Sequence, residues 1–101
     1  TFDLDNFNSK KANADALYYL ALYHEELNEL TKAQEGYEAS LELRRELAEM
    51  QDKYRGDVAK TLNNLGNLYK TLFEYDKAEK CLSESYEIYK YISKTTWMSE
   101  D

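Results

Sequence analysis

The chain contains no proline, three glycines and one cysteine among its 101 residues. A β-sandwich of this length needs many turns, and turns draw on glycine and proline, so the composition disfavours a β fold. The single cysteine, Cys81, allows no disulfide bond within the chain. No apolar run approaches the roughly 20 residues that span a bilayer. These absences leave one small domain without disulfides or membrane spans.

Positive charge is also scarce in this sequence. Thirteen Lys and Arg residues stand against twenty Asp and Glu residues, which gives a formal net charge of −7. An acidic chain repels phosphate groups, so we expect no nucleic acid and no membrane as partner. The basic pairs Lys10-Lys11 and Arg44-Arg45 are expected on solvated helix faces. The chain shows no signal segment, which favours a cytoplasmic location, and its first residue, a threonine, suggests a piece of a longer protein.

The residues that are abundant favour helices. Ala, Leu, Glu, Lys and Tyr are in surplus, and 43% of the residues are hydrophobic. Such a composition without helix breakers is typical of all-α proteins. Aromatic residues make up 14% of the chain, which is more than a disordered segment carries. We therefore predict an all-α fold with a packed core.

An internal repeat emerges when the sequence is shifted by 45 residues. The matching positions are apolar or small and keep helical spacing. The matches include Leu17 with Leu62, Leu20 with Leu65, Ala21 with Gly66, Leu27 with Leu72, Ala33 with Ala78, Ser40 with Ser85, Leu43 with Ile88, and Leu47 with Ile92. The chain is thus one domain, residues 1–101, with repeat one at about 14–55 and repeat two at about 57–94.

Each repeat divides into two predicted helices. The breaks are indicated by a capping pair, Thr31 with Gln34, by the segment 55–57, where Gly56 suits the end of a helix and Asp57 the start of the next, and by Asp76 with Glu79. In the first helix, we expect the apolar stripe that starts at Leu17 to face the core. The expected helices cover about residues 13–30, 31–54, 57–72 and 76–94, with irregular ends at 1–8 and 95–101.

The second copy resembles a tetratricopeptide repeat (TPR). The residues that carry the resemblance are Leu62, Leu65, Gly66, Tyr69, Tyr75, Ala78 and Leu82. The first copy matches at Leu17, Leu20, Ala21, Ala33 and Tyr37, with His24 in place of the usual tyrosine. The period of 45 resembles the long repeats of kinesin light chains and related bacterial proteins. The resemblance implies two antiparallel hairpins, four main helices in all, stacked as a fragment of a right-handed α-α superhelix.

The resemblance also implies a function in binding proteins. TPR arrays use the inner face of the first helix of each hairpin as a peptide groove, so we expect a protein or peptide partner there. Three asparagines within five residues weaken a helix, which favours a binding role for them. Glu25 and Glu26 beside this face favour a partner with a basic side chain. The predicted contact residues are Tyr18, Tyr19, Leu22, Lys60, Asn63, Asn64 and Asn67.

Three alternatives to this groove remain open at the sequence level. Lys60 and Asn64 match part of the carboxylate clamp of chaperone-binding TPRs, but Tyr18 and Leu22 do not. The segment is alternatively a structural spacer, or a scaffold segment that self-associates through exposed end faces. A third alternative is the sensor region of a TPR-type peptide receptor.

Catalysis finds little support in the sequence. The chain has one histidine, His24, and one cysteine, Cys81, and no third group or glycine-rich loop accompanies them. We expect His24 to be packed between helices and Cys81 to be buried and inert. Metal binding needs more His or Cys at chelating spacing. We therefore predict a protein that is not an enzyme, with no metal and no cofactor.

Overall fold

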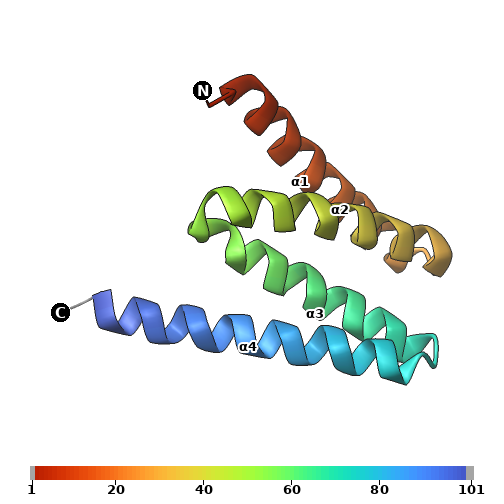
Figure 1. Ribbon diagram of the computed structural model, residues 1–101. Helices are drawn as coiled ribbons and strands as arrows, with labels where there is room; N and C mark the ends of the chain where they lie inside the picture. Colours follow the sequence, from red (N-terminus) through yellow and green to blue (C-terminus); the bar gives the residue numbers. More distant parts are fainter. Residues whose placement is uncertain (1, 100–101) are drawn as a thin grey trace.

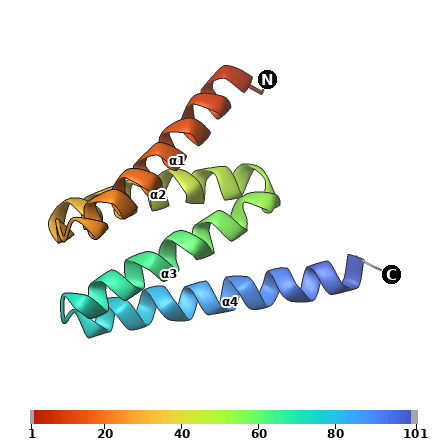
Figure 2. The same cartoon turned by 180° about the vertical axis from the view of Figure 1, so that it is seen from behind.

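A computed structural model describes residues 2–99 of the chain, with side chains through residue 95. Four α-helices follow one another: α1 at Leu4–Glu26, α2 at Leu30–Met50, α3 at Arg55–Thr71 and α4 at Tyr75–Ser99. A short 3-10 helix, η1, covers Asp52–Tyr54. Helices α1 and α2 form one antiparallel hairpin, and α3 and α4 form the second (Figures 1 and 2). The predicted all-α fold of two helical hairpins is confirmed.

The hairpins lie side by side in chain order, with α1 and α4 at opposite edges of the molecule (Figure 1). Both hairpin turns lie at one end, and η1 lies at the other end with the start of α1 (Figures 1 and 2). Helix α2 packs against α3, and this contact joins the two repeats. The main core spans this junction. It contains Tyr18, Ala21, Ala33, Tyr37, Leu65, Leu68, Tyr69 and Ala78.

The two hairpin turns share one backbone geometry. At the end of α1, Asn28 takes a left-handed conformation with φ of 60°, and the N–H of Glu29 donates to the carbonyl of His24. At the end of α3, Phe73 has φ of 64°, and the N–H of Glu74 donates to the carbonyl of Tyr69. Both turns are Schellman motifs, which satisfy carbonyls that a helix end leaves unpaired. The 45-residue repeat therefore extends to the turns.

The helices of each hairpin approach closely at small residues. A Cβ added to Gly66 of α3 would lie 2.7 Å from Cγ of Leu82 on α4, so this position has no room for a side chain. Ala78 is buried at the same junction. Gly66, one of the residues that carry the resemblance, therefore lets α3 and α4 approach closely.

The predicted helix boundaries between the elements were partly wrong. Helix α2 begins at Leu30 and its N-cap, Glu29, makes no side-chain capping bond, so Thr31 with Gln34 is no capping box. The predicted break at 55–57 is also misplaced: Gly56 lies inside the first turn of α3 without a positive φ. Likewise α4 begins at Tyr75, one residue before Asp76. The Schellman turns fix the starts of α2 and α4. The chain reverses direction before α3 in the segment that contains η1.

The predicted irregular ends, 1–8 and 95–101, are wrong over residues 4–8 and 95–99, which are helical, whereas residues 2–3 are irregular as predicted. Helix α1 begins at Leu4 because the Asp3 carboxylate accepts a 3.0 Å hydrogen bond from the Asn6 backbone N–H. Phe7 then packs against Tyr54, with 5.7 Å between ring centroids, in a second core cluster. At the other end, α4 continues to Ser99. Residues 1 and 100–101 lie outside the described residues.

The face of α1 that packs on the core differs from the face predicted from its leucines. Its buried residues are Phe7, Ala14, Tyr18 and Ala21. Leu20 and Leu27, by contrast, are exposed. The expectation that the leucines of α1 face the core was therefore wrong at these two positions, because no helix lies on that side of α1 among the described residues.

Candidate partner-binding surface

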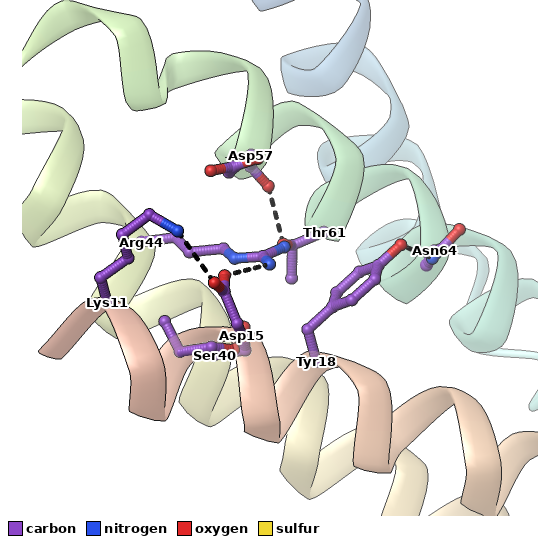
Figure 3. Close-up of polar contacts among 9 residues, drawn as sticks. Lys11, Asp15, Tyr18, Ser40, Arg44, Asp57, Thr61 and Asn64 are labelled. Carbon is purple, nitrogen blue, oxygen red and sulfur yellow. Dashed lines mark hydrogen bonds and ion pairs between the residues drawn. The ribbon is translucent and has the colours of Figure 1, made fainter. Parts of the chain in front are cut away.

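Tyr18 of α1 lies where the two hairpins meet. The residue is 2% exposed, and its ring packs against Tyr37 of α2 with 5.8 Å between centroids. Its hydroxyl accepts a 2.6 Å hydrogen bond from Nδ2 of Asn64 on α3 (Figure 3). Burial raises the pKa of the Tyr18 hydroxyl, which keeps it protonated. Tyr18 of α1 thus contacts both α2 and α3.

Arg44 of α2 crosses the same junction. Its guanidinium donates to Oγ1 of Thr61 on α3 at 2.8 Å and to Oδ1 of Asp15 on α1 at 3.0 Å (Figure 3). It also lies 4.4 Å from the centroid of the Tyr18 ring. Its Nε makes no hydrogen bond within the described part of the chain. The expectation of a solvated Arg44 was wrong, because this buried cation joins the two repeats.

Asp15 is the counter-ion of this junction. Its carboxylate accepts from Arg44 and, at 3.0 Å, from Nζ of Lys11 one turn earlier. Burial by itself raises the pKa of the Asp15 carboxyl, but the hydrogen bonds from Lys11 and Arg44 together outweigh burial. The pKa therefore lies below its ordinary value, and Asp15 stays ionised at neutral pH.

Lys60 of α3 extends over the aromatic pair of α1. Its Nζ lies 4.9 Å from the ring centroid of Tyr18 and 5.8 Å from that of Tyr19. The two rings meet edge-to-face with 5.2 Å between centroids, and Tyr19 is exposed. A cation from one repeat and an aromatic ring from the other thus share one exposed surface. Asn63 and Asn67 on α3 are exposed as well.

The seven predicted contact residues divide into two groups. Tyr18 is buried, so the expectation that it offers its ring to a partner was wrong. Asn64 is half-buried and its amide nitrogen is engaged by Tyr18, while Leu22 packs against the core. The exposed group consists of Tyr19, Lys60, Asn63 and Asn67. For this group, a binding role stays a prediction.

Surface hollows lie away from these residues, and two of them are formed by neighbouring helices. The first is a cleft formed by α2, α3 and α4, lined by Arg45, Ala48, Glu49, Arg55, Val58, Glu84 and Ile88. Its charges are partly paired, since Arg45 binds Glu84 at 2.5 Å and Arg55 binds Asp52 at 2.5 Å. The second hollow lies between α1 and α2 and is lined by Asn13, Ala16, Leu17, Leu20 and Leu43.

The single histidine and cysteine have structural surroundings. His24 is partly buried, as predicted, and its Nδ1 lies 2.7 Å from Oε1 of Glu29. This hydrogen bond lowers the pKa of the Glu29 carboxyl. Cys81 is partly rather than fully buried, and burial raises the pKa of its thiol. Among the described residues, no three His, Cys, Asp or Glu side chains are grouped to hold a metal ion.

Sequence reasoning missed the polar junction of Asp15, Arg44 and Thr61. Its signal was weak: these residues lie on faces of α1, α2 and α3 that only the packing of three helices brings together. The buried face of α1, by contrast, could have been predicted from the sequence. Its residues follow one another at steps of seven, four and three, which places Phe7, Ala14, Tyr18 and Ala21 on one helix face.

Two hairpins related by a 45-residue shift, with each turn and crossing repeated, define a helical-repeat protein that stacks its units side by side. The family model of the tetratricopeptide repeat matches residues 12–90, and the chain belongs to this family. The resemblance seen in the second copy is thereby confirmed, while a special relation to kinesin light chains stays a prediction. Searches among curated proteins and among solved structures found no match. In the part of the chain that the structure describes, each helix is too short or too polar to cross a membrane.

Proposed function

We propose that this tetratricopeptide repeat domain is a non-catalytic module that binds a peptide segment of a partner protein across α1 and α3. The family acts in protein–protein interactions in general. The observation that supports this surface is the position of Lys60, whose ammonium group lies over the rings of both Tyr18 and Tyr19. Because Lys60 comes from α3 and Tyr19 from α1, a bound segment would contact both repeats.

The chemistry of this surface suits an extended peptide. Asn63 and Asn67 are exposed amides that both donate and accept hydrogen bonds, as a peptide backbone requires. Exposed Tyr19 supplies apolar area with a polar tip. Glu26 is exposed at the end of the same helix, while Glu25 already accepts from the hydroxyl of Tyr37 at 2.7 Å. Glu26 therefore favours a basic side chain on the peptide.

A matched pair of double variants tests this proposal. A displayed library of random peptides is selected on the wild-type domain, and the enriched peptides are titrated against Lys60→Ala/Asn67→Ala and Lys80→Ala/Gln51→Ala. Each variant loses one exposed lysine and one exposed amide. We expect at least a tenfold weaker affinity for the first variant, about 1.4 kcal/mol, and wild-type affinity for the second.

Circular dichroism of both variants controls for folding, since all four side chains are exposed. We call the exposed group of Tyr19, Lys60, Asn63 and Asn67 the inner surface. Equal binding of the peptides by the two variants would contradict a site on the inner surface and favour another face. A selection that enriches no peptide would favour the structural spacer instead.

A further inference from the structure

The side of α1 that faces away from α3 is apolar and open, and its Ala16 and Leu20 line one hollow together with Leu43 of α2. Leu20 is 50% exposed, and Tyr23 and Leu27 are exposed to a similar degree. Together with Ala16, these residues follow one helix face at steps of four and three. We call this set, Ala16, Leu20, Tyr23 and Leu27, the leading face. A contiguous apolar face of this kind marks an interaction surface.

The internal repeat shows what covers such a face. Shifted by 45 residues, Leu20 corresponds to Leu65 and Tyr23 to Leu68. Leu65 is only 2% exposed, because it packs in the core together with Tyr37 of α2 and its neighbour Leu41. The leading face is thus the equivalent of a face that α2 covers in the second repeat.

The opposite edge of the molecule carries the complementary surface. Helix α4 corresponds to α2, so Tyr86 stands at the position of Leu41 and Tyr89 at that of Arg44. Leu41 packs against the core and Arg44 is buried, whereas Tyr86 and Tyr89 are both exposed on α4. We call these two tyrosines the trailing face. It lies on the last helix of the row, at the edge opposite α1 (Figures 1 and 2).

We propose that the trailing face of one copy of this chain packs on the leading face of a second copy, which repeats the α2–α3 contact between molecules. At one position of this pairing the side-chain sizes compensate each other. Within the chain, Arg44 meets Thr61; between chains, the equivalent positions bring Tyr89 against Ala16. The smaller Ala16 offers room for the larger ring, and the buried polar pair becomes an apolar one. Because the two faces differ, the contact is heterologous and leaves one open face at each end of an assembly.

Sedimentation velocity of the wild-type chain over a series of concentrations is the first test. We expect the mean mass to rise with concentration beyond that of a dimer, since each added copy presents a new open face. A wild-type chain that stays monomeric up to submillimolar concentration would overturn the proposal. The leading face would then be left for a helix of another repeat or another protein.

Two charge variants test the direction of packing. Leu20→Glu disables the leading face and Tyr86→Glu disables the trailing face, so each variant alone is expected to sediment as a monomer. An equimolar mixture is expected to form a dimer and nothing larger, because only one intact face of each kind remains. The exposed Phe73 lies in the turn between α3 and α4 and belongs to neither face, and Phe73→Glu serves as the control that associates like the wild type.

Failure of this proposal is distinguishable from failure of the peptide site. Neither Leu20 nor Tyr86 belongs to the inner surface, so both variants are expected to bind selected peptides with wild-type affinity. Association of Leu20→Glu or Tyr86→Glu alone at wild-type strength would overturn the proposal. So would a mixture that contains only monomers, provided that circular dichroism shows both variants to be folded.

Discussion

Gly36 of α2 lies directly against Ala21 of α1, and a Cβ added to Gly36 would be 2.9 Å from the Cβ of Ala21. In the second repeat, Gly66 of α3 faces Cys81 of α4 in the same way, with a corresponding distance of 3.2 Å. Each helix crossing thus contains one glycine, but the two glycines lie on opposite helices of the hairpin. A crossing needs one glycine to bring the helices this close, and either helix can supply it.

Gly36→Ala is expected to destabilise the domain. Overpacking a core typically costs about 1–3 kcal/mol, and the better helix propensity of alanine returns about 1 kcal/mol. The expected net loss in the free energy of unfolding is therefore up to about 2 kcal/mol. Urea unfolding followed by circular dichroism measures it. The double variant Ala21→Gly/Gly36→Ala moves the glycine to α1 and should restore wild-type stability; a single variant as stable as the wild type would contradict the close contact.

Ser40 and Ser85 are expected to contribute equally to stability. Both are buried, and the Oγ of Ser40 donates to the carbonyl of Ala14 at 2.7 Å while that of Ser85 donates to the carbonyl of Ala59 at 2.8 Å. Because these contacts are related by the repeat, Ser40→Ala and Ser85→Ala should each cost about 1 kcal/mol. Urea unfolding of the two variants checks this. Widely different losses would show that the repeats are not energetically equivalent.

Phe73→Gly is expected to stabilise the second hairpin. A left-handed backbone costs a residue with a side chain about 1–2 kcal/mol, whereas glycine adopts it without strain but loses more entropy on folding. We expect a net gain of about 0.5–1 kcal/mol in the free energy of unfolding. Asn28→Gly is the matched comparison in the first turn and should gain less, because asparagine tolerates this conformation. A loss of stability in Phe73→Gly would mean that the contact of its ring with Tyr75 outweighs the strain.

The Asp15 carboxyl is expected to make stability depend on acid pH. Its pKa is lower in the folded chain than in the unfolded one, because the hydrogen bonds from Lys11 and Arg44 outweigh the opposing effect of burial. This contribution is therefore complete above the unfolded pKa, about 4, and is lost as the pH falls through the folded value. Asp15→Asn should be less stable than the wild type at neutral pH.

That difference between Asp15→Asn and the wild type should begin to shrink below about pH 4, where the carboxyl of the unfolded wild type takes up its proton. It should be lost once the pH falls below the lower pKa of the folded chain. Thermal unfolding between pH 2 and 7 measures both chains. Glu42→Gln removes an exposed carboxylate that has no bonded partner among the described residues and serves as the control. A constant difference across the whole pH range would show that Asp15 acts through packing and not through its charge.

The repeat was the part of the fold that the sequence revealed best. A shift of 45 residues aligns not only leucines but also the buried serines and the two left-handed turn residues, Asn28 and Phe73. Helix ends were harder to predict. The backbone bonds of the Schellman turns fix the starts of α2 and α4, and these bonds require no particular side chain, so Thr31 and Asp76 were misleading.

The candidate site was predictable only in part, because burial at the junction depends on a neighbouring helix. Tyr18 and Asn63 occupy equivalent positions, yet Tyr18 is buried and Asn63 is exposed. Helix α3 lies beside Tyr18 and places Lys60 and Asn64 on it, whereas the described residues place no further hairpin beside Asn63. A residue pattern within one repeat does not contain this difference. Arg44 was missed for the same reason, since its partners belong to two other helices.

The bonds of Arg44 make the two hairpins mechanically interdependent. If either hairpin opened alone, this buried cation would lose Asp15 or Thr61, and an uncompensated buried charge is strongly unfavourable. Repeat arrays are described by the intrinsic stability of each unit and a coupling term between neighbours. Here the coupling term combines this guanidinium group with the apolar core that spans the junction, so the domain should lose its structure in a single all-or-none step.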